Sequence, residues 1–358
     1  MTPVRFSVGY RIMDGEPDYF SDIVEDHARR VAEVYFAWPG VNSGRSPLDE
    51  DARAQLEWEL GRITGWGIGL NLLLNASCFG EEACSPALVD RLMAVVDDVA
   101  ARFGVRAVTT MSPVIGHAVK ERHPEIDLRA SVNMRLGTVR GMAYVADLYD
   151  SYCVQREFNR DGARLAALQR WAADNGKRLH VLANSGCMNY CSFQTFHDNA
   201  VAHESAIHTR GRLADSQTLC RSYLAESAHW SNLLSGSSWI RPEDIASHRR
   251  VFAGGYKLAT RAHDDPRRVI EAYVRGSHRG NLLDLLEPGL GPALYPRVLD
   301  NAAFGTDWFE RTMSCAGECA SCGYCERKLK DVLVDVEGAL ASRLGIPAAD
   351  VARAVTSS

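Results

Sequence analysis

The sequence contains no apolar run of the length that crosses a bilayer, which is about 18 residues or more. Its first ten residues carry one arginine and lack the apolar segment of a secretory signal. We therefore expect neither a membrane span nor export, and we expect a cytoplasmic location.

Basic tracts are missing as well. The net charge of the 358 residues is −5 and the pI is about 6.1. No run is rich in lysine and arginine, and none alternates basic with aromatic residues as single-strand binding proteins do. Charge therefore gives no support for RNA as a partner.

Two groups of enzyme signatures are absent from the sequence. No glycine-rich dinucleotide fingerprint follows the first predicted strand, which disfavours a doubly wound open sheet. No Ser–His–Asp pattern or His-Glu-x-x-His helix indicates a protease.

Short apolar runs alternate with stretches of helical periodicity over roughly the first 260 residues. This alternation predicts an α/β protein with a parallel (β/α)8 TIM-like barrel over residues 1–265. A C-terminal cysteine-rich helical extension is predicted over 266–358. The predicted strands are 6–10, 32–36, 67–74, 106–111, 126–131, 148–155, 179–183 and 255–259, and the predicted helices include 85–103, 161–175, 266–275 and 327–344.

The strongest chemical signal is the motif Cys315-x3-Cys319-x2-Cys322-x2-Cys325. Iron in a cluster takes thiolate ligands, and spacings of two or three residues let one loop surround it. Zinc is the rival, although zinc sites usually use two separated pairs. Disulfides are disfavoured because no export signal is present. The first three cysteines have the spacing of a radical S-adenosylmethionine motif, but they lie at the wrong end of the chain for one.

A second group of cysteines follows the seventh predicted strand. Cys187 and Cys191 lie close to His197 and His203, and Cys220 comes further on. The sequence leaves open whether the seven thiols hold one shared cluster or two. Cys78 and Cys84 fit neither group, and Cys153 lies in a strand pattern typical of a core residue.

The catalytic site of a barrel lies at the carboxyl ends of its strands. Arg45 and Arg156 follow predicted strands there, and a guanidinium can hold a carboxylate or phosphate with two hydrogen bonds. His197 and His203 are candidates for proton transfer near neutral pH. Asn184 and Gly186 are candidates for contact with the cofactor, since glycine lets the backbone approach a bulky ligand.

Several short motifs, taken in chain order, resemble the peptidase U32 family. They include Asn184-x-Gly-Cys187-x3-Cys191-Ser-Phe, the stretches 239–244 and 256–261, and earlier pieces around 110–116, 130–133 and 155–161. The resemblance covers most of residues 5–280 and implies a barrel with a cysteine-ligated [4Fe–4S] cluster. It places Cys187, Cys191 and Cys220 in the cluster-binding region. The first pair is closer together than in better-known members, which leaves the fourth ligand open, with a tail cysteine as one candidate.

Several members of that family hydroxylate transfer RNA, ribosomal RNA or the ubiquinone ring without oxygen. The resemblance therefore implies an iron–sulfur redox enzyme acting on a small molecule, a peptide or RNA, with an electron donor as partner and one or two [4Fe–4S] clusters. One alternative is a non-catalytic cluster-binding subunit of a homo- or hetero-oligomer. Another is a U32-type peptidase or other hydrolase whose cysteines bind zinc.

Overall fold

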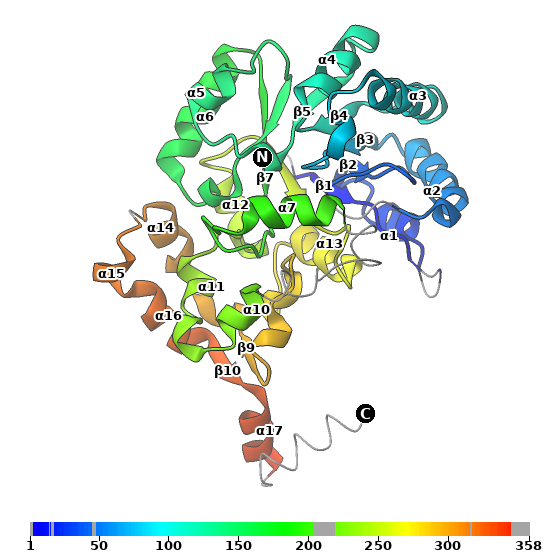
Figure 1. Cartoon of the computed structure of the whole chain (residues 1–358). Helices are drawn as coiled ribbons and strands as arrows, with labels where there is room; N and C mark the ends of the chain where they lie inside the picture. Colours follow the sequence, from blue (N-terminus) through cyan, green and yellow to red (C-terminus); the bar gives the residue numbers. More distant parts are fainter. Residues whose placement is uncertain are drawn as a thin grey trace.

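A closed barrel of eight parallel strands forms the centre of the protein (Figure 1). The computed structural model describes residues 3–13, 15, 18–44, 48–203, 219–315 and 317–344. All eight predicted strands are confirmed, and each pairs with its neighbours in chain order. They are β1 Phe6–Gly9, β2 Val31–Phe36, β3 Gly69–Leu74, β4 Ala107–Thr110, β5 Asp127–Ala130, β6 Ser151–Cys153, β7 Arg178–Leu182 and β8 Gly255–Leu258.

Helices surround the barrel, and their ends follow from local chemistry. Ser85 begins α3 by accepting a hydrogen bond from the backbone N–H of Leu88, and Gly104 ends it in the left-handed conformation. No helix in the described ranges has the length and apolarity to cross a membrane. The barrel helices are α1 Phe20–Asp26, α2 Arg53–Gly65, α3 Pro86–Phe103, α4 Pro113–Arg122, α5 Val139–Ala143, α6 Gly162–Asp174, α12 Ile245–His248 and α13 Pro266–Arg275.

The connection from β7 to β8 is much longer than the others. It carries α7, Gln194–Ala202, which crosses in front of the barrel in Figure 1, and the short helices α10, Leu219–Leu224, and α11, Asn232–Ser235. Because this connection leaves from the carboxyl end of β7, its first part lies where barrel enzymes keep their sites.

The extension packs around a second apolar core. This core joins Leu233, Leu234 and Trp239 of the long connection to residues 282–333. The predicted boundary at 265/266 is therefore too early, since α13 buries Val269 and Ile270 in the barrel core. The remaining elements are β9 Arg297–Leu299, α14 Asp307–Met313, α15 Cys319–Cys322, α16 Tyr324–Val332, β10 Leu333–Asp335 and α17 Val336–Leu344.

The prediction of one continuous helix over 327–344 is wrong, because a short strand interrupts it. The chain leaves helical geometry at Leu333 and forms β10, which pairs antiparallel with β9. Leu333 packs against the second core, and the pairing with β9 satisfies backbone groups that a helix would otherwise bond internally. Tertiary contact thus overrides the local helical preference.

A stack of aromatic rings fastens the extension to the barrel. Trp239 lies parallel to Trp308 with ring centroids 5.4 Å apart, and Trp308 lies nearly parallel to Tyr324 at 6.2 Å. Phe304 meets both tryptophans edge-on. Trp239 precedes Ile240, whose N–H bonds to Ala183 just after β7, so the stack connects the end of a barrel strand to α16.

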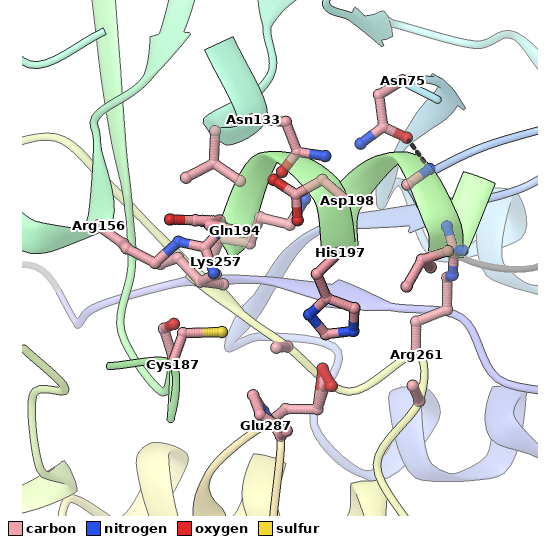
Figure 2. A pocket seen from close by; sticks show the side chains of 18 of the residues that line it. Asn75, Asn133, Arg156, Cys187, Gln194, His197, Asp198, Lys257, Arg261 and Glu287 are labelled. Atoms are coloured by element: carbon pink, nitrogen blue, oxygen red, sulfur yellow. Dashed lines mark hydrogen bonds between the residues drawn. The ribbon is translucent and has the colours of Figure 1, made fainter. Parts of the chain in front are cut away.

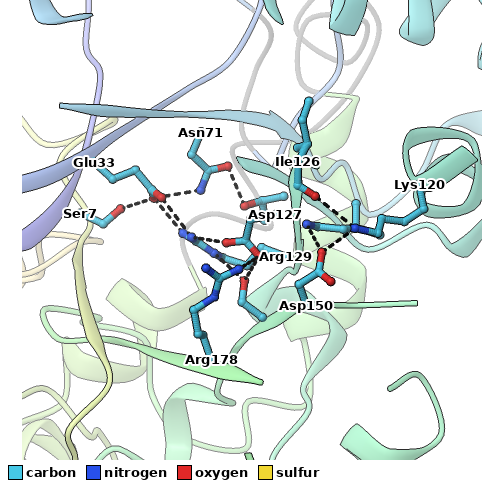
Figure 3. Close-up of polar contacts among 12 residues, drawn as sticks. Ser7, Glu33, Asn71, Lys120, Ile126, Asp127, Arg129, Asp150 and Arg178 are labelled. Atoms are coloured by element: carbon cyan, nitrogen blue, oxygen red, sulfur yellow. Dashed lines mark hydrogen bonds and ion pairs between the residues drawn. The ribbon is translucent and has the colours of Figure 1, made fainter. Parts of the chain in front are cut away.

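The barrel interior holds a polar network instead of a purely apolar core (Figure 3). Arg129 donates from Nη1 and Nη2 to the two carboxylate oxygens of Glu33 at 2.8 and 3.0 Å. Burial alone would raise the pKa of Glu33, but the Arg129 charge and hydrogen bonds outweigh it and lower the pKa to about 2. Each of the first six strands contributes at least one side chain to this network: Ser7, Glu33, Asn71, Thr109, Asp127, Arg129 and Ser151.

Glu33→Gln should destabilise the fold strongly at neutral pH because Arg129 is left buried without its main counter-charge. We expect a loss of about 3–5 kcal/mol in the free energy of unfolding. Since the folded pKa of Glu33 lies below its unfolded value, the ion-pair contribution is present above about pH 4.5 and fades as the pH falls towards 2. Urea unfolding of both proteins should therefore show a gap at pH 7 that narrows at pH 3.

The matched control for this prediction is Glu25→Gln. Glu25 also pairs with an arginine, Arg62 at 2.9 Å, but its side chain is 53% exposed. Water screens such a pair, so its loss should cost at most about 1 kcal/mol. Equal losses for the two variants would contradict a special role for the interior pair.

Trp308→Ala should loosen the extension, because it removes the middle ring of the aromatic stack and leaves a cavity. The expected loss is about 3–5 kcal/mol, measured by chemical unfolding. Trp58→Ala serves as control, since Trp58 is 51% exposed. A loss for Trp308→Ala no larger than that of the control would argue against the stack as the fastening of the extension.

Candidate functional site

A cavity opens at the carboxyl ends of the strands, beneath α7 (Figure 2). Its volume is about 170 Å³, close to the roughly 150 Å³ of a cavity that admits benzene. Only a small ligand or one end of a larger one fits. The polar residues and cysteines that line it are Tyr35, Asn75, Asn133, Arg156, Ser185, Cys187, Cys191, Gln194, His197, Asp198, Cys220, Lys257, Arg261 and Glu287.

Three thiols from two segments of the chain line this cavity. Cys187 and Cys191 flank a turn in which Tyr190 adopts the left-handed conformation with φ of 55°, a geometry that non-glycine residues rarely take. Cys220 comes from α10. Burial raises the pKa of the Cys220 thiol, and the nearby thiols of Cys187 and Cys191 raise it further. A cation close to Cys220 would therefore favour its thiolate form.

Gly186 and Asn184 are predicted to contact the cofactor, but in the structure both connect backbone segments to one another. A Cβ on Gly186 would lie 2.5 Å from the carbonyl oxygen of Pro288, so the close approach is between two backbone segments. The buried Asn184 amide donates to the carbonyls of Ala259 and Leu285 and accepts from the N–H of Ala259. Neither residue lines the cavity.

Two cations, Arg156 and Lys257, line the cavity. Arg156 is 8% exposed, and its guanidinium makes no hydrogen bond or ion pair within the described part of the chain. The ammonium of Lys257 lies 3.7 Å from the centroid of the Tyr35 ring. Burial lowers the pKa of Lys257. The Tyr35 ring takes this position because Gly9 has no side chain, since a Cβ there would lie 2.6 Å from it.

Carboxylates complete the cavity wall from opposite sides. Asp198 on α7 lies 3.6 Å from Arg135, and burial raises the pKa of Asp198 against the effect of Arg156 and Arg135. Glu287 reaches the cavity from the extension, where its N–H bonds to the carbonyl of Asn184. His197 lies between these two acids in Figure 2. The arrangement supplies both proton donors and acceptors within one small space.

Two further predicted catalytic residues are not brought to this cavity. His203 is the C-terminal cap of α7, and its ring lies on the side of Gly80, away from the lining residues. Arg45 lies outside the described residues.

The four tail cysteines line a separate cavity of about 450 Å³ in the extension. Cys315, Cys319 and Cys325 also border a neighbouring cavity together with Asn189, Tyr190 and Arg160. The turn that presents Cys187 and Cys191 to the barrel mouth thus has two of its intervening residues, Asn189 and Tyr190, on the side of the tail thiols. Cys153, by contrast, is buried at 3% exposure, as predicted for a core residue.

The seven thiols form two groups, and the number of thiols in a group limits which cofactor that group could hold. No group of three or more His, Cys, Asp or Glu side chains in the described ranges could hold a metal ion in its present position. The thiolates of an iron–sulfur cubane bind different iron atoms, so they lie further apart than the ligands of one ion. Four tail thiols match the ligand number of one cluster, and three mouth thiols leave one position for another ligand.

Sequence reasoning missed Asp198 and Glu287 as members of the site. Asp198 follows His197 directly in a segment already singled out. Glu287 had no signal, since its place depends on how the extension folds back onto β7.

No protein-family model matches the sequence, and no curated protein is similar to it in sequence. Solved structures do match the fold. The U32 peptidase Mk0906 superposes with a TM-score of 0.50 at 14% identity, over 72% of this chain and 94% of that one. A chitinase, RmChi1 from Rhizomucor miehei, gives a TM-score of 0.41 at 12% identity, over 76% and 98% of the two chains. Phosphoribosylanthranilate isomerase from Thermotoga maritima gives 0.37 at 10% identity, again over 76% and 98%.

The similarity to Mk0906 agrees with the family resemblance read from the short motifs, and at this level of identity it concerns the fold. The chain has a (β/α)8 barrel fold similar to that of the U32 peptidase Mk0906.

Proposed function

We propose that this protein is an iron–sulfur redox enzyme whose active site is the cavity at the barrel mouth. The observation that carries the proposal is the trio of thiols, Cys187, Cys191 and Cys220, beside the cations Arg156 and Lys257. Thiolates and a thiolate-bound cluster are anionic, so cations at this place offset their charge. A [4Fe–4S] cluster held by these thiols would supply electron transfer and an iron atom open to a substrate oxygen.

The chain's own residues have distinct parts in this proposal. Arg156 binds an acidic group of the substrate, because its nearly buried donors have no other acceptor among the described residues. His197 and Asp198 hold or move a proton beside it. Helix α7 covers the mouth and keeps water from the reacting group. The reaction class is an oxygen-independent hydroxylation or a related oxidation of a small molecule or peptide.

The tail thiols belong to a second cluster in this proposal. They line their own cavity, so the earlier alternative of one cluster shared between barrel and tail has less support than two separate ones. A one-electron carrier protein is the natural donor for such a pair. The scaffold and hydrolase alternatives have no comparable observation in their favour.

The iron content of anaerobically purified protein tests this arrangement. Wild type should bind about eight irons, and the double variants Cys187→Ser/Cys191→Ser and Cys319→Ser/Cys322→Ser about four each. Cys84→Ser is the control, because Cys84 is exposed and lines neither cavity, and it should keep all the iron.

Three outcomes would contradict the proposal. A colourless protein with about one zinc would remove the redox function. Loss of all iron in the tail variant would mean that the two groups of thiols share one cluster. Full iron in the mouth variant would separate the barrel cavity from any cluster.

Arg156→Gln should weaken the binding of acetate, a carboxylate small enough for the cavity, to the iron-loaded protein. Hydrogen bonds to a charged group are worth about 1.5–3 kcal/mol, which is roughly a ten- to hundredfold change in Kd. Saturation-transfer NMR measures such weak affinities. Arg164→Gln is the matched control, since Arg164 lies on the same segment but pairs with Asp161 away from the cavity. Unchanged acetate binding by Arg156→Gln would remove Arg156 from the substrate site.

A further inference from the structure

Arg160 occupies an unusual place between the barrel and the extension. Its guanidinium lies over two tryptophan rings, 5.0 Å from the centroid of Trp239 and 5.3 Å from that of Trp308. Its Nη2 donates to the carbonyl of Leu234 at 3.0 Å. Its Nη1 is buried and has no hydrogen-bond partner in the described ranges. A buried guanidinium donor without an acceptor costs free energy, so its retention calls for a reason.

The surroundings of Arg160 supply no carboxylate that explains it. The carboxylate that interacts electrostatically with Arg160 is that of Asp244. Both of its oxygens, however, accept hydrogen bonds from Arg241 at 2.8 Å. Arg160 also interacts electrostatically with the thiols of Cys325 and Cys315. All three residues line one cavity. The missing acceptor is therefore to be sought among the tail thiols.

We propose that Arg160 is the buried cationic partner of an anionic cluster bound by the tail cysteines, to which its Nη1 donates the hydrogen bond that it lacks. The inference rests on the tail cluster of the proposed function and adds a role for one residue of the barrel. Arg160 follows β6 in the same segment as Arg156, so this segment presents one cation to the barrel mouth and one to the tail thiols. Arg160 is a positioning residue, and its effect is on the electron affinity of the cluster.

The expected effect has a definite sign. One-electron reduction makes a thiolate-bound cluster more negative, so a nearby buried cation favours the reduced state. Removing the cation should therefore make the midpoint potential more negative. In Arg160→Gln we expect at least a tenfold change in the equilibrium constant for reduction, which is about 59 mV for a one-electron couple.

The measurement is a redox titration followed by electron paramagnetic resonance. It uses the full chain in the Cys187→Ser/Cys191→Ser background, so that the tail signal stands alone. Arg160→Lys keeps the charge and should shift the potential less than Arg160→Gln. Arg311→Gln is the matched control, because Arg311 donates to the sulfur of Cys322 at 3.3 Å from an exposed position, where water screens its charge.

A second measurement does not depend on Arg160→Gln folding. The Cys187→Ser/Cys191→Ser background also carries Arg311→Gln here, because Arg311 donates to the sulfur of Cys322 and would give a signal of its own. With nitrogen-15 arginine, the reduced tail cluster of this protein should show a hyperfine coupling to a guanidinium nitrogen, and the coupling should disappear when Arg160→Lys is added. Its absence before Arg160→Lys is added, or its persistence afterwards, would overturn the proposal.

The outcomes separate this inference from the function on which it rests. Iron on the tail thiols, with equal potentials in Arg160→Gln and Arg311→Gln, would overturn the role of Arg160 alone. Tail thiols that bind no iron in wild type, while the mouth thiols do, would overturn both the tail cluster and the role of Arg160. A larger negative shift in Arg160→Gln than in Arg311→Gln supports the proposal.

Discussion

The side-chain amide of Asn184 is the contact on which both cavities depend. Its oxygen accepts a hydrogen bond from the backbone N–H of Ala259, just past β8. Its nitrogen donates to the carbonyl of Ala259 and to that of Leu285 in the extension. Immediately afterwards, Gly186 lets the backbone of residues 286–288 come within contact distance. These bonds are buried, where an unmade hydrogen bond is costly, so the junction has little freedom. The extension is thereby built into the barrel mouth and supplies Glu287 to its wall.

Charge is distributed around this junction in a consistent way. The interior of the barrel neutralises its own buried charges, since Arg129 is paired with Glu33 and Asp127. The cavities hold further cations: Arg156 and Lys257 share the mouth with the carboxylates Asp198 and Glu287, and Arg160 has one guanidinium nitrogen without a hydrogen-bond partner in the described ranges. The clusters proposed above are anionic and would offset these charges.

The aromatic stack and the segments that carry the tail thiols are parts of one assembly. Trp308 precedes the first tail cysteine by seven residues, and Tyr324 lies between the last two. The rings that fasten the extension therefore also hold the segments that carry the thiols. A rigid support of this kind keeps ligand positions defined, which a functional metal site needs.

The barrel itself was predictable from the sequence, because strand and helix patterns depend on which residues alternate between core and solvent within a few positions. The same holds for the grouping of tail thiols and for Cys153 as a core residue. The packing of α13 in the barrel core, the break of the last helix at Leu333 and the second apolar core were not predictable in this way, since each depends on packing between distant segments.

The residues of the candidate site can likewise be divided into those that the sequence predicted and those that depend on packing between distant segments. The sequence by itself determined that Cys187, Cys191 and His197 follow the seventh strand, and that Arg156 follows the sixth, because strand order sets which loops meet at the mouth. Only the tertiary structure decided that His203 and the Asn184 side chain do not join them, and that Asp198 and Glu287 do. The physical reason is that side-chain direction and loop return depend on long-range contacts, above all the backbone bonds between residues 184–186 and 285–287, which leave no local pattern in the sequence.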